Sequence, residues 1–463
     1  MLRSGGPAGN ARPASYTLTF WGARRAARED GRSLGFPVYQ VESSTALLRG
    51  HRRLLTRGRR APRVSRTVVL LGIVSLLTDI SAEMVSTILP LYLVYTLGFT
   101  PLQYGLVDGA YQGASALVRL ISGFTADRSR RHKEVATVGY GLSAVCKLGL
   151  VVAGGAFSAI GALVLLDRTG KGIRTAPRDA MISLSSTPAT LGTAFGVHRA
   201  LDTTGAMLGP LVAFGLLAMA PLAFDSVFMV SFCVAVVGVA LLVLFVDGRP
   251  EGPAGAASPE PLPAPSLTEA GSLLRVPGFG RLIVVGSVLG LATLSDGFLY
   301  LALERRVDFE PTVFPLLFVG TALVYMLLAV PMGRLADRVG RGRVFVGGYA
   351  LLALLYGVIL MPAAGWWTVP LALALLGIYY AATDGVLMAL GSALSPPSLR
   401  GTSLALLGTA TSMARLLASV IFGALWMALG MEEAIVCFGL ALVAALALGG
   451  LALTRGREGT AHA

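Results

Sequence analysis

Twelve stretches of predominantly apolar residues recur along the chain, and they constrain its fold more than any other feature. A helix that crosses the hydrocarbon core of a bilayer needs about 20 such residues. Only 14% of the 463 residues are charged, whereas soluble domains carry about 25%. This composition disfavours a soluble enzyme and excludes a disordered chain or a disulfide scaffold. The expected spans are residues 67–95, 103–126, 134–154, 158–180, 190–218, 225–246, 281–303, 311–333, 344–363, 367–391, 402–429 and 433–454.

The positive charge of the chain is concentrated before the first span. The net charge is +13, and residues 1–66 hold 14 Arg against three acidic residues, which leaves 24 basic and 22 acidic residues elsewhere. Basic side chains beside a membrane attract anionic lipids, and no nucleic-acid-binding motif accompanies them. We expect a disordered cytoplasmic tail near anionic lipid. Two other interpretations explain the Arg-rich residues 1–66: a solvated tail that only sets the orientation of the chain, or a start codon assigned too far upstream. These are favoured over a tail that binds lipid or regulates the protein.

The loops between the spans predict the orientation of the chain. Lys and Arg are concentrated in the loops 127–133 and 334–343 and at Arg455 and Arg457. The loops expected on the opposite side of the membrane lack Lys and Arg, except for Arg305 and Arg306. Such residues remain in the cytoplasm, so both termini are expected there. The Pro-, Gly- and Ala-rich segment 247–280 cannot bury a core.

This segment is therefore expected to be a flexible cytoplasmic linker. The predicted fold is all-α, with twelve transmembrane helices in two pseudo-symmetric six-helix bundles, 67–246 and 281–454, and a short cytoplasmic tail, 455–463. We expect a monomer in the plasma membrane, which is the inner membrane in a bacterium.

An internal repeat supports the division into two halves. GFTADRSRR begins at Gly123 and GRLADRVGR at Gly333, 210 positions later. GIRTAPRDAM at Gly172 and GIYYAATDGV at Gly377 are 205 positions apart. Near-constant offsets favour a duplication, and two repeats of six spans are expected to lie parallel, related by an axis along the membrane normal.

These motifs make the chain resemble the major facilitator superfamily over about residues 67–454. Residues at two symmetric positions match that family's loop motif: Gly123, Asp127, Arg128 and Arg131, and then Gly333, Asp337, Arg338, Gly340 and Arg341. The segment DRTGKGIRTAPRD resembles the Arg-containing motif of the fourth helix through Arg168 and Gly172. GAMLGP resembles the antiporter motif of the fifth helix through Gly205, Gly209 and Pro210.

The resemblance implies roles for these residues. Arg168 takes the family's role in proton transfer or substrate orientation, and Asp127 and Asp337 form a cytoplasmic latch that favours the outward-open state. From spacing alone, Gly205 and Gly209 form a small-residue face that allows close helix contact, and Pro210 bends the helix. We expect Arg168 to take part in proton coupling. The residues expected to take part in gating are Gly123, Asp127, Arg128, Arg131, Gly333, Asp337, Arg338, Arg341, Gly205, Gly209 and Pro210.

Ionisable side chains near the middle of a span are candidates for function, because each costs about 2.5–3.5 kcal/mol on insertion scales. Asp79 and Glu83 lie four residues apart in the first span and therefore share a helix face. Two carboxylates about 6 Å apart in a low dielectric do not readily ionise together. This favours proton coupling through Asp79 and Glu83, with pairing to a basic residue of another helix as the alternative.

The fourth span carries a stripe of charged residues at steps of four, three and four: Asp167, Lys171, Arg174 and Arg178. We expect Lys171 and Arg174 to line the substrate cavity. Snorkelling to the membrane interface is the alternative for Arg174 and the favoured interpretation for Arg178. We expect the cavity to be completed by Arg199 from the fifth span, Asp296 and Tyr300 from the seventh, and Arg415 from the eleventh.

For some of these residues a structural role is an equal or better interpretation. An intrahelical pair of Arg199 with Asp202 and a packed His198 are favoured in the fifth span. Asp296 and Arg415 either pair with each other or bind substrate, and the sequence does not separate these. Arg119, Lys147, Asp108 and Asp384 are weaker candidates. The intramembrane residues include seven basic and seven acidic ones, and this balance does not favour a cationic or an anionic substrate.

Together, these observations favour a secondary active transporter. No Walker loop, zinc-ligand cluster or catalytic triad is visible, so we expect no enzyme, no metal and no cofactor, with the proton gradient as the energy source. A receptor with an inactive transporter fold is disfavoured because it has no need of costly buried charges. The leading hypothesis is proton-coupled export of a small organic molecule. The alternative is proton-coupled import of a small metabolite, with anions favoured by the basic stripe.

Overall fold

The computed structural model describes residues 64–129, 131–187, 190–247, 273–276, 278–362, 365–395 and 399–454. All of them belong to the larger of two units, residues 37–463. Most of the predicted tail 1–66, most of the linker 247–280 and all of residues 455–463 lie outside the described residues. Those predictions therefore remain predictions.

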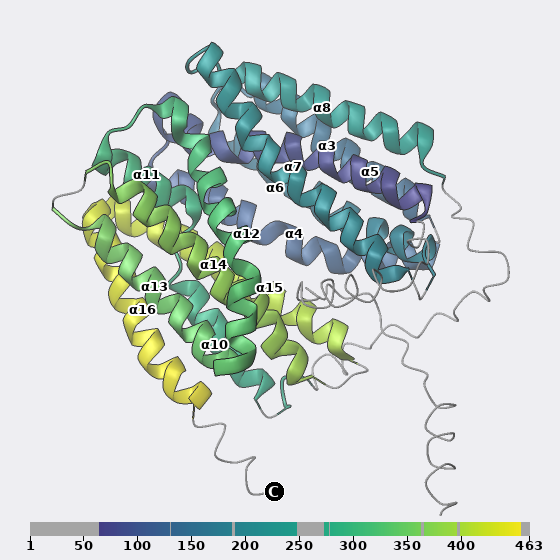
Figure 1. Ribbon diagram of the computed structural model, residues 1–463. Coiled ribbons are helices and arrows are strands. Elements are labelled where there is room, and N and C mark those ends of the chain that lie inside the picture. Colours follow the sequence, from purple (N-terminus) through teal and green to yellow (C-terminus); the bar gives the residue numbers. More distant parts are fainter. Residues whose placement is uncertain are drawn as a thin grey trace, which may run out of the picture. The chain divides into compact units, whose positions relative to one another are not determined.

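The described residues form helices and no strand (Figure 1). The first half contains α3 (Arg66–Leu91, continued by a π-helical turn, Tyr92–Thr96), α4 (Pro101–Ser129), α5 (His132–Val152), α6 (Phe157–Leu184), α7 (Leu191–Met219) and α8 (Phe224–Phe245). The second half contains α10 (Phe279–Leu291), α11 (Asp296–Val307), a 3-10 turn (Pro311–Val313), α12 (Phe314–Val339), α13 (Arg341–Ile359), α14 (Thr368–Ala393), α15 (Arg400–Leu429) and α16 (Met431–Thr454). Each expected span coincides with a helix, except that the seventh is divided into α10 and α11.

Ten of the described helical segments are long and apolar enough to cross a membrane, with α10 and α11 counted as one. The other two, α4 and α6, have 29 and 28 residues and carry more polar side chains. Both pack against helices on more than one side, α4 against α6 and α15, and α6 against α4 and α5. Contacts with protein shelter their polar residues from lipid, which explains why the apolar character is weaker in these two.

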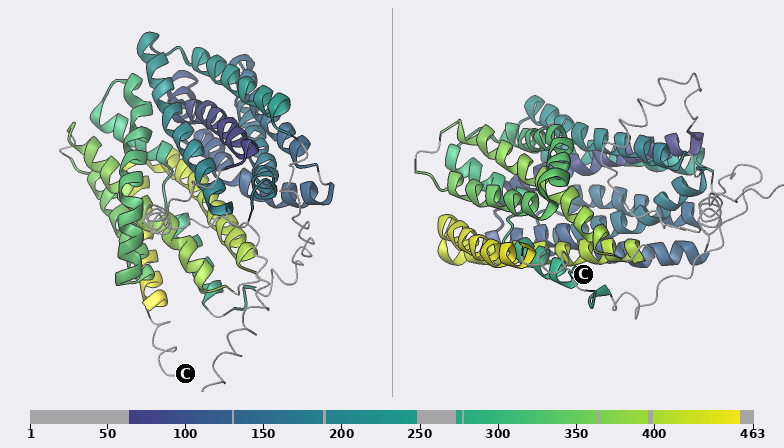
Figure 2. Two further views of the ribbon diagram at one scale, coloured as in Figure 1. Left: turned by 45° about the vertical axis from the view of Figure 1, so that its right-hand side comes forward. Right: turned by 60° about the horizontal axis from the view of Figure 1, so that its bottom comes forward.

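The helix pairs of the first half recur in the second. In the first half, α7 and α8 pack on α3, and α6 packs on both α4 and α5. The corresponding pairs in the second half are α15 and α16 with α10, and α14 with both α12 and α13. Across the halves, α4 packs along α15, and α7 contacts α12 (Figures 1 and 2).

Glycines allow the closest of these helix contacts. A Cβ atom at Gly209 of α7 would lie 2.7 Å from the Ile80 carbonyl oxygen of α3. A Cβ atom at Gly205 of α7 would overlap the backbone of Leu76, also in α3. The small-residue face expected on the fifth span therefore packs against α3. The sequence analysis missed a second face on α4, where Gly105, Gly109 and Gly113 follow steps of four and pack against α15. These three glycines are the glycine face of α4.

The division between α10 and α11 lies inside the membrane-spanning part of the chain. Ser295 caps α11 by accepting a hydrogen bond from the Phe298 amide at 3.4 Å. The hydroxyl of Tyr356 accepts from the Leu294 amide at 2.8 Å and donates to the Ala292 carbonyl at 3.1 Å. Non-helical backbone at this depth is tolerated only where protein or a cavity covers it. The break between α10 and α11 therefore predicts protein or a cavity beside it.

Candidate functional site

A cavity of about 220 Å³ lies between the two halves of the helical unit. It is bounded by α3, α4, α11, α12, α14, α15 and the break between α10 and α11. Its lining residues are Glu83, Ser86, Leu89, Pro90, Tyr104, Val107, Asp108, Tyr111, Gln112, Thr293, Leu294, Ser295, Asp296, Gly297, Phe318, Tyr380, Arg415 and Ser419.

Three carboxyl groups face this cavity, and each accepts a hydrogen bond from a hydroxyl group. Glu83 Oε2 accepts from Ser86 at 2.6 Å on its own helix, α3. Asp108 Oδ2 of α4 accepts from Ser419 of α15 at 2.6 Å. Asp296 Oδ1, in the first turn of α11, accepts from Tyr380 of α14 at 2.5 Å. Side chains from both halves thus organise the carboxyl groups.

Arg415 is the one basic residue among the lining residues. Its Nη2 atom lies 3.8 Å from Asp384 Oδ1 on α14, and Asp384 is not part of the lining. The structure thus places both Asp296 and Arg415 at the cavity, as expected. Asp296 bonds to Tyr380 and Arg415 lies beside Asp384, so the structure does not show the two as an ion pair with each other.

A second group of charged side chains lies next to the cavity within the first half. Asp167 accepts from Lys147 at 3.0 Å and from Arg168 at 2.7 Å, and Ser143 donates to it as well. The Arg168 guanidinium lies 3.9 Å from the centre of the Tyr111 ring, and Tyr111 lines the cavity on the other side of that contact. Arg168 is therefore buried and paired, one ring away from the cavity.

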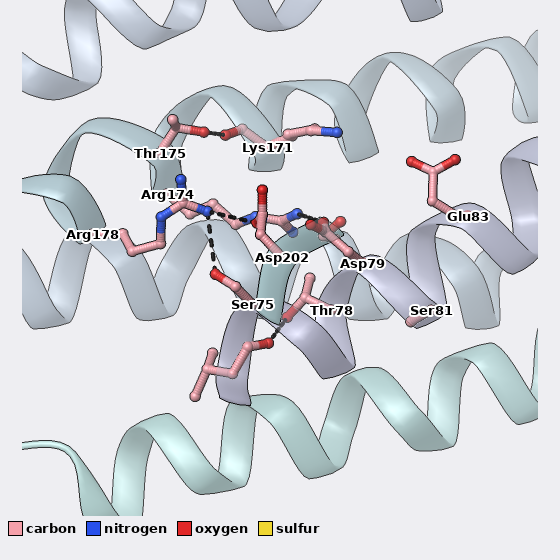
Figure 3. Close-up of polar contacts among 12 residues, drawn as sticks. Ser75, Thr78, Asp79, Ser81, Glu83, Lys171, Arg174, Thr175, Arg178 and Asp202 are labelled. Carbon is pink, nitrogen blue, oxygen red and sulfur yellow. Dashed lines mark hydrogen bonds and ion pairs between the residues drawn. The ribbon is translucent and has the colours of Figure 1, made fainter. Parts of the chain in front are cut away.

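A third group joins α3, α6 and α7, and we call it the α3–α6–α7 cluster: Ser75, Asp79, Arg174, Arg178, Asp179, His198 and Asp202. Figure 3 labels Ser75, Asp79, Arg174, Arg178 and Asp202 of this cluster. Arg174 lies 3.7 Å from Asp79, and Arg178 lies 3.6 Å from Asp202 and 3.0 Å from Asp179. Ser75 bonds to His198 at 2.9 Å and accepts from Arg178 at 3.2 Å. The Asp79 and Asp202 carboxyl groups lie close enough to interact electrostatically.

Two predictions about this cluster need correction. Asp79 and Glu83 were expected to act as a pair on one face, but Asp79 turns to Asp202 and Glu83 turns to the cavity (Figure 3). One turn of helix separates them. Asp79 pairs with Arg174 of α6, as the alternative interpretation predicted, and interacts with Asp202 of α7, whereas Glu83 accepts from Ser86 of its own helix. Arg178 was expected to snorkel, but it is only 7% exposed. Three acceptors within the protein satisfy its guanidinium, so reaching the interface offers no gain.

Four residues expected in the substrate cavity are not among its lining residues. Lys171 and Arg174 lie on the α3 side of α6, and Arg174 packs over the Tyr140 ring at 4.8 Å. The Arg199 side chain is 61% exposed and pairs with Asp202 at 3.3 Å, as the favoured interpretation predicted. Tyr300 is buried, and its hydroxyl donates to Thr321 at 2.7 Å.

The sequence analysis underrated the contribution of α4. Asp108 was a weaker candidate, and Tyr104 and Tyr111 were not considered, although steps of four and three place all three on one helical side. That periodicity was a usable signal. Ser419 and Ser295 carry no such signal, because their importance depends on which helices meet.

The two loop motifs differ in how much of them is described. In the second, Asp337 Oδ1 accepts from Arg341 at 3.1 Å, and Arg341 also donates to the Ala389 carbonyl at 3.3 Å. Arg338 lies in the last turn of α12. A Cβ atom added at Gly333 would meet no other atom within 4 Å. In the first, Arg131 is exposed. The side chains of Gly123, Asp127 and Arg128 lie outside the described residues.

Comparison with known protein families is consistent with this arrangement of helices and decides the family. The profile of the Major Facilitator Superfamily matches residues 71–310 and again residues 291–462. The chain belongs to the Major Facilitator Superfamily. It is a membrane transporter of that superfamily and not an enzyme.

Two relatives of this chain carry names that state no substrate. An uncharacterised MFS-type transporter of Methanocaldococcus jannaschii is 32% identical over 382 residues, which is 78% of this chain and 89% of the relative. An uncharacterised protein of Mycobacterium tuberculosis is 40% identical over 154 residues, which is 33% of this chain and 37% of that protein.

Solved structures of superfamily transporters share the fold. The nucleoside transporter NupG aligns with a TM-score of 0.70 at 14% identity, over 84% of this chain and 99% of that one. A peptide transporter, POT, in complex with alafosfalin aligns with a TM-score of 0.70 at 16% identity, over 84% and 94%. At such low identity these similarities establish the fold, and the substrate of this chain has to be argued from its own cavity.

Within the described residues, no group of three or more His, Cys, Asp or Glu side chains is arranged to hold a metal ion. The buried carboxylates instead face hydroxyl groups, arginines or one another.

Proposed function

We propose that the protein is a secondary transporter that exports a small organic molecule in exchange for protons. The observation that carries the proposal is the position of two carboxyl groups on α3. Glu83 lines the central cavity, and Asp79, one turn away, interacts with Asp202 of α7 beside Arg174. A rigid helix thus connects a substrate cavity to a pair of carboxyl groups.

The Asp79–Asp202 pair is suited to exchange a proton. Two carboxyl groups close together, away from bulk water, are most stable when they share one proton, because two neighbouring negative charges repel. Loss of that proton strengthens the attraction to Arg174 of α6 and to Arg178, which lies 3.6 Å from Asp202. Protonation therefore changes how tightly α3, α6 and α7 hold together.

Coupling requires that the two conformations differ in affinity for the proton. In the proposed cycle, the two six-helix bundles rock about the cavity and expose it alternately to either side of the membrane. Gly205, Gly209 and Pro210 allow α7 to move against α3, and the loop motifs at Asp127 and Asp337 stabilise one state. The proton gradient supplies the energy, and no cofactor is involved.

Proton-coupled import of a small anionic metabolite is the alternative. It is favoured by the basic residues of α6, namely Arg168, Lys171, Arg174 and Arg178. Most of these have carboxylate partners within the first half: Asp167 for Arg168, Asp79 for Arg174, and Asp179 and Asp202 for Arg178. Because their charge is largely balanced there, export is the better supported direction.

The direction of flux under an imposed proton gradient tests the proposal. Metabolites inside and outside cells that express the wild type, Asp79→Asn or Glu83→Gln are compared by mass spectrometry, with and without an uncoupler. Glu310→Gln is the matched control, because Glu310 is an exposed carboxylate that only accepts a hydrogen bond from Thr312. A compound enriched outside the cell only with wild type and control, and lost on uncoupling, is expected. Enrichment inside would establish import instead.

A further inference from the structure

We infer that the central cavity binds a small organic cation, in which an ammonium group is attached to an aromatic or apolar body. The inference rests on the proposed transport function and adds the chemical class of the substrate. Equal numbers of acidic and basic intramembrane residues do not predict a substrate charge. The folded chain separates them in space.

The carboxyl groups are concentrated at the cavity. Glu83, Asp108 and Asp296 line it, against Arg415 alone on the basic side. Glu83 and Asp296 each accept one hydrogen bond from a neighbouring hydroxyl, and Asp108 accepts from up to three, those of Ser419, Ser295 and Tyr104, whereas a carboxylate has about four acceptor positions in all. Acceptor capacity thus remains for a ligand that donates hydrogen bonds and carries positive charge.

Most buried basic residues outside the cavity are paired with acids that do not line it. Asp167 binds both Lys147 and Arg168, and Asp79 lies beside Arg174. Arg168 and Lys171 also attract Glu83 electrostatically, so Asp108 and Asp296 are the cavity carboxylates farthest from the α6 charges in their interactions. At the cavity itself, Arg415 approaches Asp384, which lies outside the lining. A positive ligand therefore meets a surplus of negative charge with little competing repulsion.

The backbone break also reaches the cavity. The break between α10 and α11 brings Thr293, Leu294 and Ser295 to the cavity wall. The C-terminal end of α10 carries partial negative charge and the N-terminal end of α11 partial positive charge, so the charge preference of the site comes from its side chains.

Aromatic rings supply the remaining part of the site. Tyr104, Tyr111, Phe318 and Tyr380 line the cavity, and the face of such a ring attracts a cation. The wall already shows this contact, because Arg168 occupies one face of Tyr111 at 3.9 Å. A volume of about 220 Å³ is below the range of about 300–1,000 Å³ of drug-sized ligand pockets. The ligand is therefore small.

Equilibrium binding to the purified full-length protein in detergent tests the inference. The probes are tetramethylammonium, benzyltrimethylammonium and benzenesulfonate, titrated calorimetrically at constant ionic strength. We expect saturable binding of both ammonium ions, tighter for benzyltrimethylammonium because its ring meets the aromatic wall, and none of benzenesulfonate. Tighter binding of benzenesulfonate, or no binding of either ammonium ion, would overturn the inference.

Variants locate the binding. Asp296→Asn and Glu83→Gln are expected to weaken benzyltrimethylammonium binding about tenfold or more, since each removes a charged hydrogen-bond acceptor. Glu310→Gln should leave the affinity unchanged. Thermal unfolding of each variant without ligand shows whether it is folded. Unchanged affinity in both folded cavity variants would place the cation elsewhere and overturn the inference.

Failure of this inference and failure of the proposed function are distinguishable. Binding in detergent needs no gradient, so cation binding without gradient-driven flux would reject the coupling and keep the substrate class. Gradient-driven export of a neutral or anionic compound, together with absent cation binding, would reject the substrate class and keep the function.

Discussion

The Ser419 hydroxyl of α15 donates a 2.6 Å hydrogen bond to Asp108 of α4, and this bond joins the two halves of the chain at the wall of the cavity. It is accompanied by the glycine face of α4, which lets that helix approach α15 closely. A rocking motion that opens the cavity on this side has to break the bond and part the two helices. The same residues thus line the cavity and close it.

A larger side chain on the glycine face should impair transport. A Cβ atom at Gly109 would lie 2.9 Å from the Leu416 carbonyl oxygen, so Gly109→Val keeps α4 and α15 apart. We expect transport to fall about tenfold or more, because the cavity no longer seals between the halves. Gly141→Val is the matched control, since a Cβ atom there meets nothing within 4 Å. Equal transport by the two variants would remove the closing role from this contact.

Asp202→Asn should separate exchange from coupling. The variant removes the Asp202 carboxyl group, which interacts with that of Asp79 between α3 and α7. The proton that the two groups are proposed to share is then no longer exchanged. Exchange of labelled for unlabelled substrate without a gradient should persist, while accumulation driven by a proton gradient should fall to the uncoupled level. Glu310→Gln should retain both activities. Gradient-driven accumulation by Asp202→Asn would assign coupling to other groups.

Arg178→Ala should strongly destabilise the protein. The Arg178 guanidinium is 7% exposed and lies near Asp179, Asp202 and Ser75. Removal of one partner from a buried ion pair leaves uncompensated charge and costs about 3–5 kcal/mol. Thermal unfolding in detergent measures the effect. Arg199→Ala is the comparison, because the 61% exposed Arg199 contributes at most about 1 kcal/mol. Equal midpoints for the two variants would contradict the buried network.

Asp337→Asn should reduce transport with little effect on stability. The Asp337–Arg341 pair spans the turn between α12 and α13, at 3.1 Å, and both side chains are at least 40% exposed. An exposed pair of this kind contributes about 0–1 kcal/mol, so lost transport would reflect the conformational equilibrium. Asp127→Asn is expected to act in the same direction. Initial transport rates, normalised to protein in the membrane, are the measurement. Full activity of both variants would argue against a latch.

The sequence alone determined the membrane-spanning architecture, because the need to bury about 20 apolar residues per span is written locally. All twelve expected spans coincide with helical segments, and the repeated loop motifs correctly indicated the superfamily. The same local signal was weakest for α4 and α6. Their polar residues are covered by neighbouring helices, which a hydropathy pattern does not describe.

Tertiary structure decided which charges meet. Helix periodicity correctly placed Asp79 and Glu83 near one another on α3, but the packing of α7 against α3 brought Asp202 to Asp79 and left Glu83 at the cavity. The same packing buried Arg178, paired Arg168 with Asp167 next to Tyr111, and divided the seventh span at Ala292–Ser295. Electrostatic energy depends on distances between helices that are far apart in the chain. Composition therefore gave the number of buried charges, and only the fold placed Glu83, Asp108, Asp296 and Arg415 at the cavity.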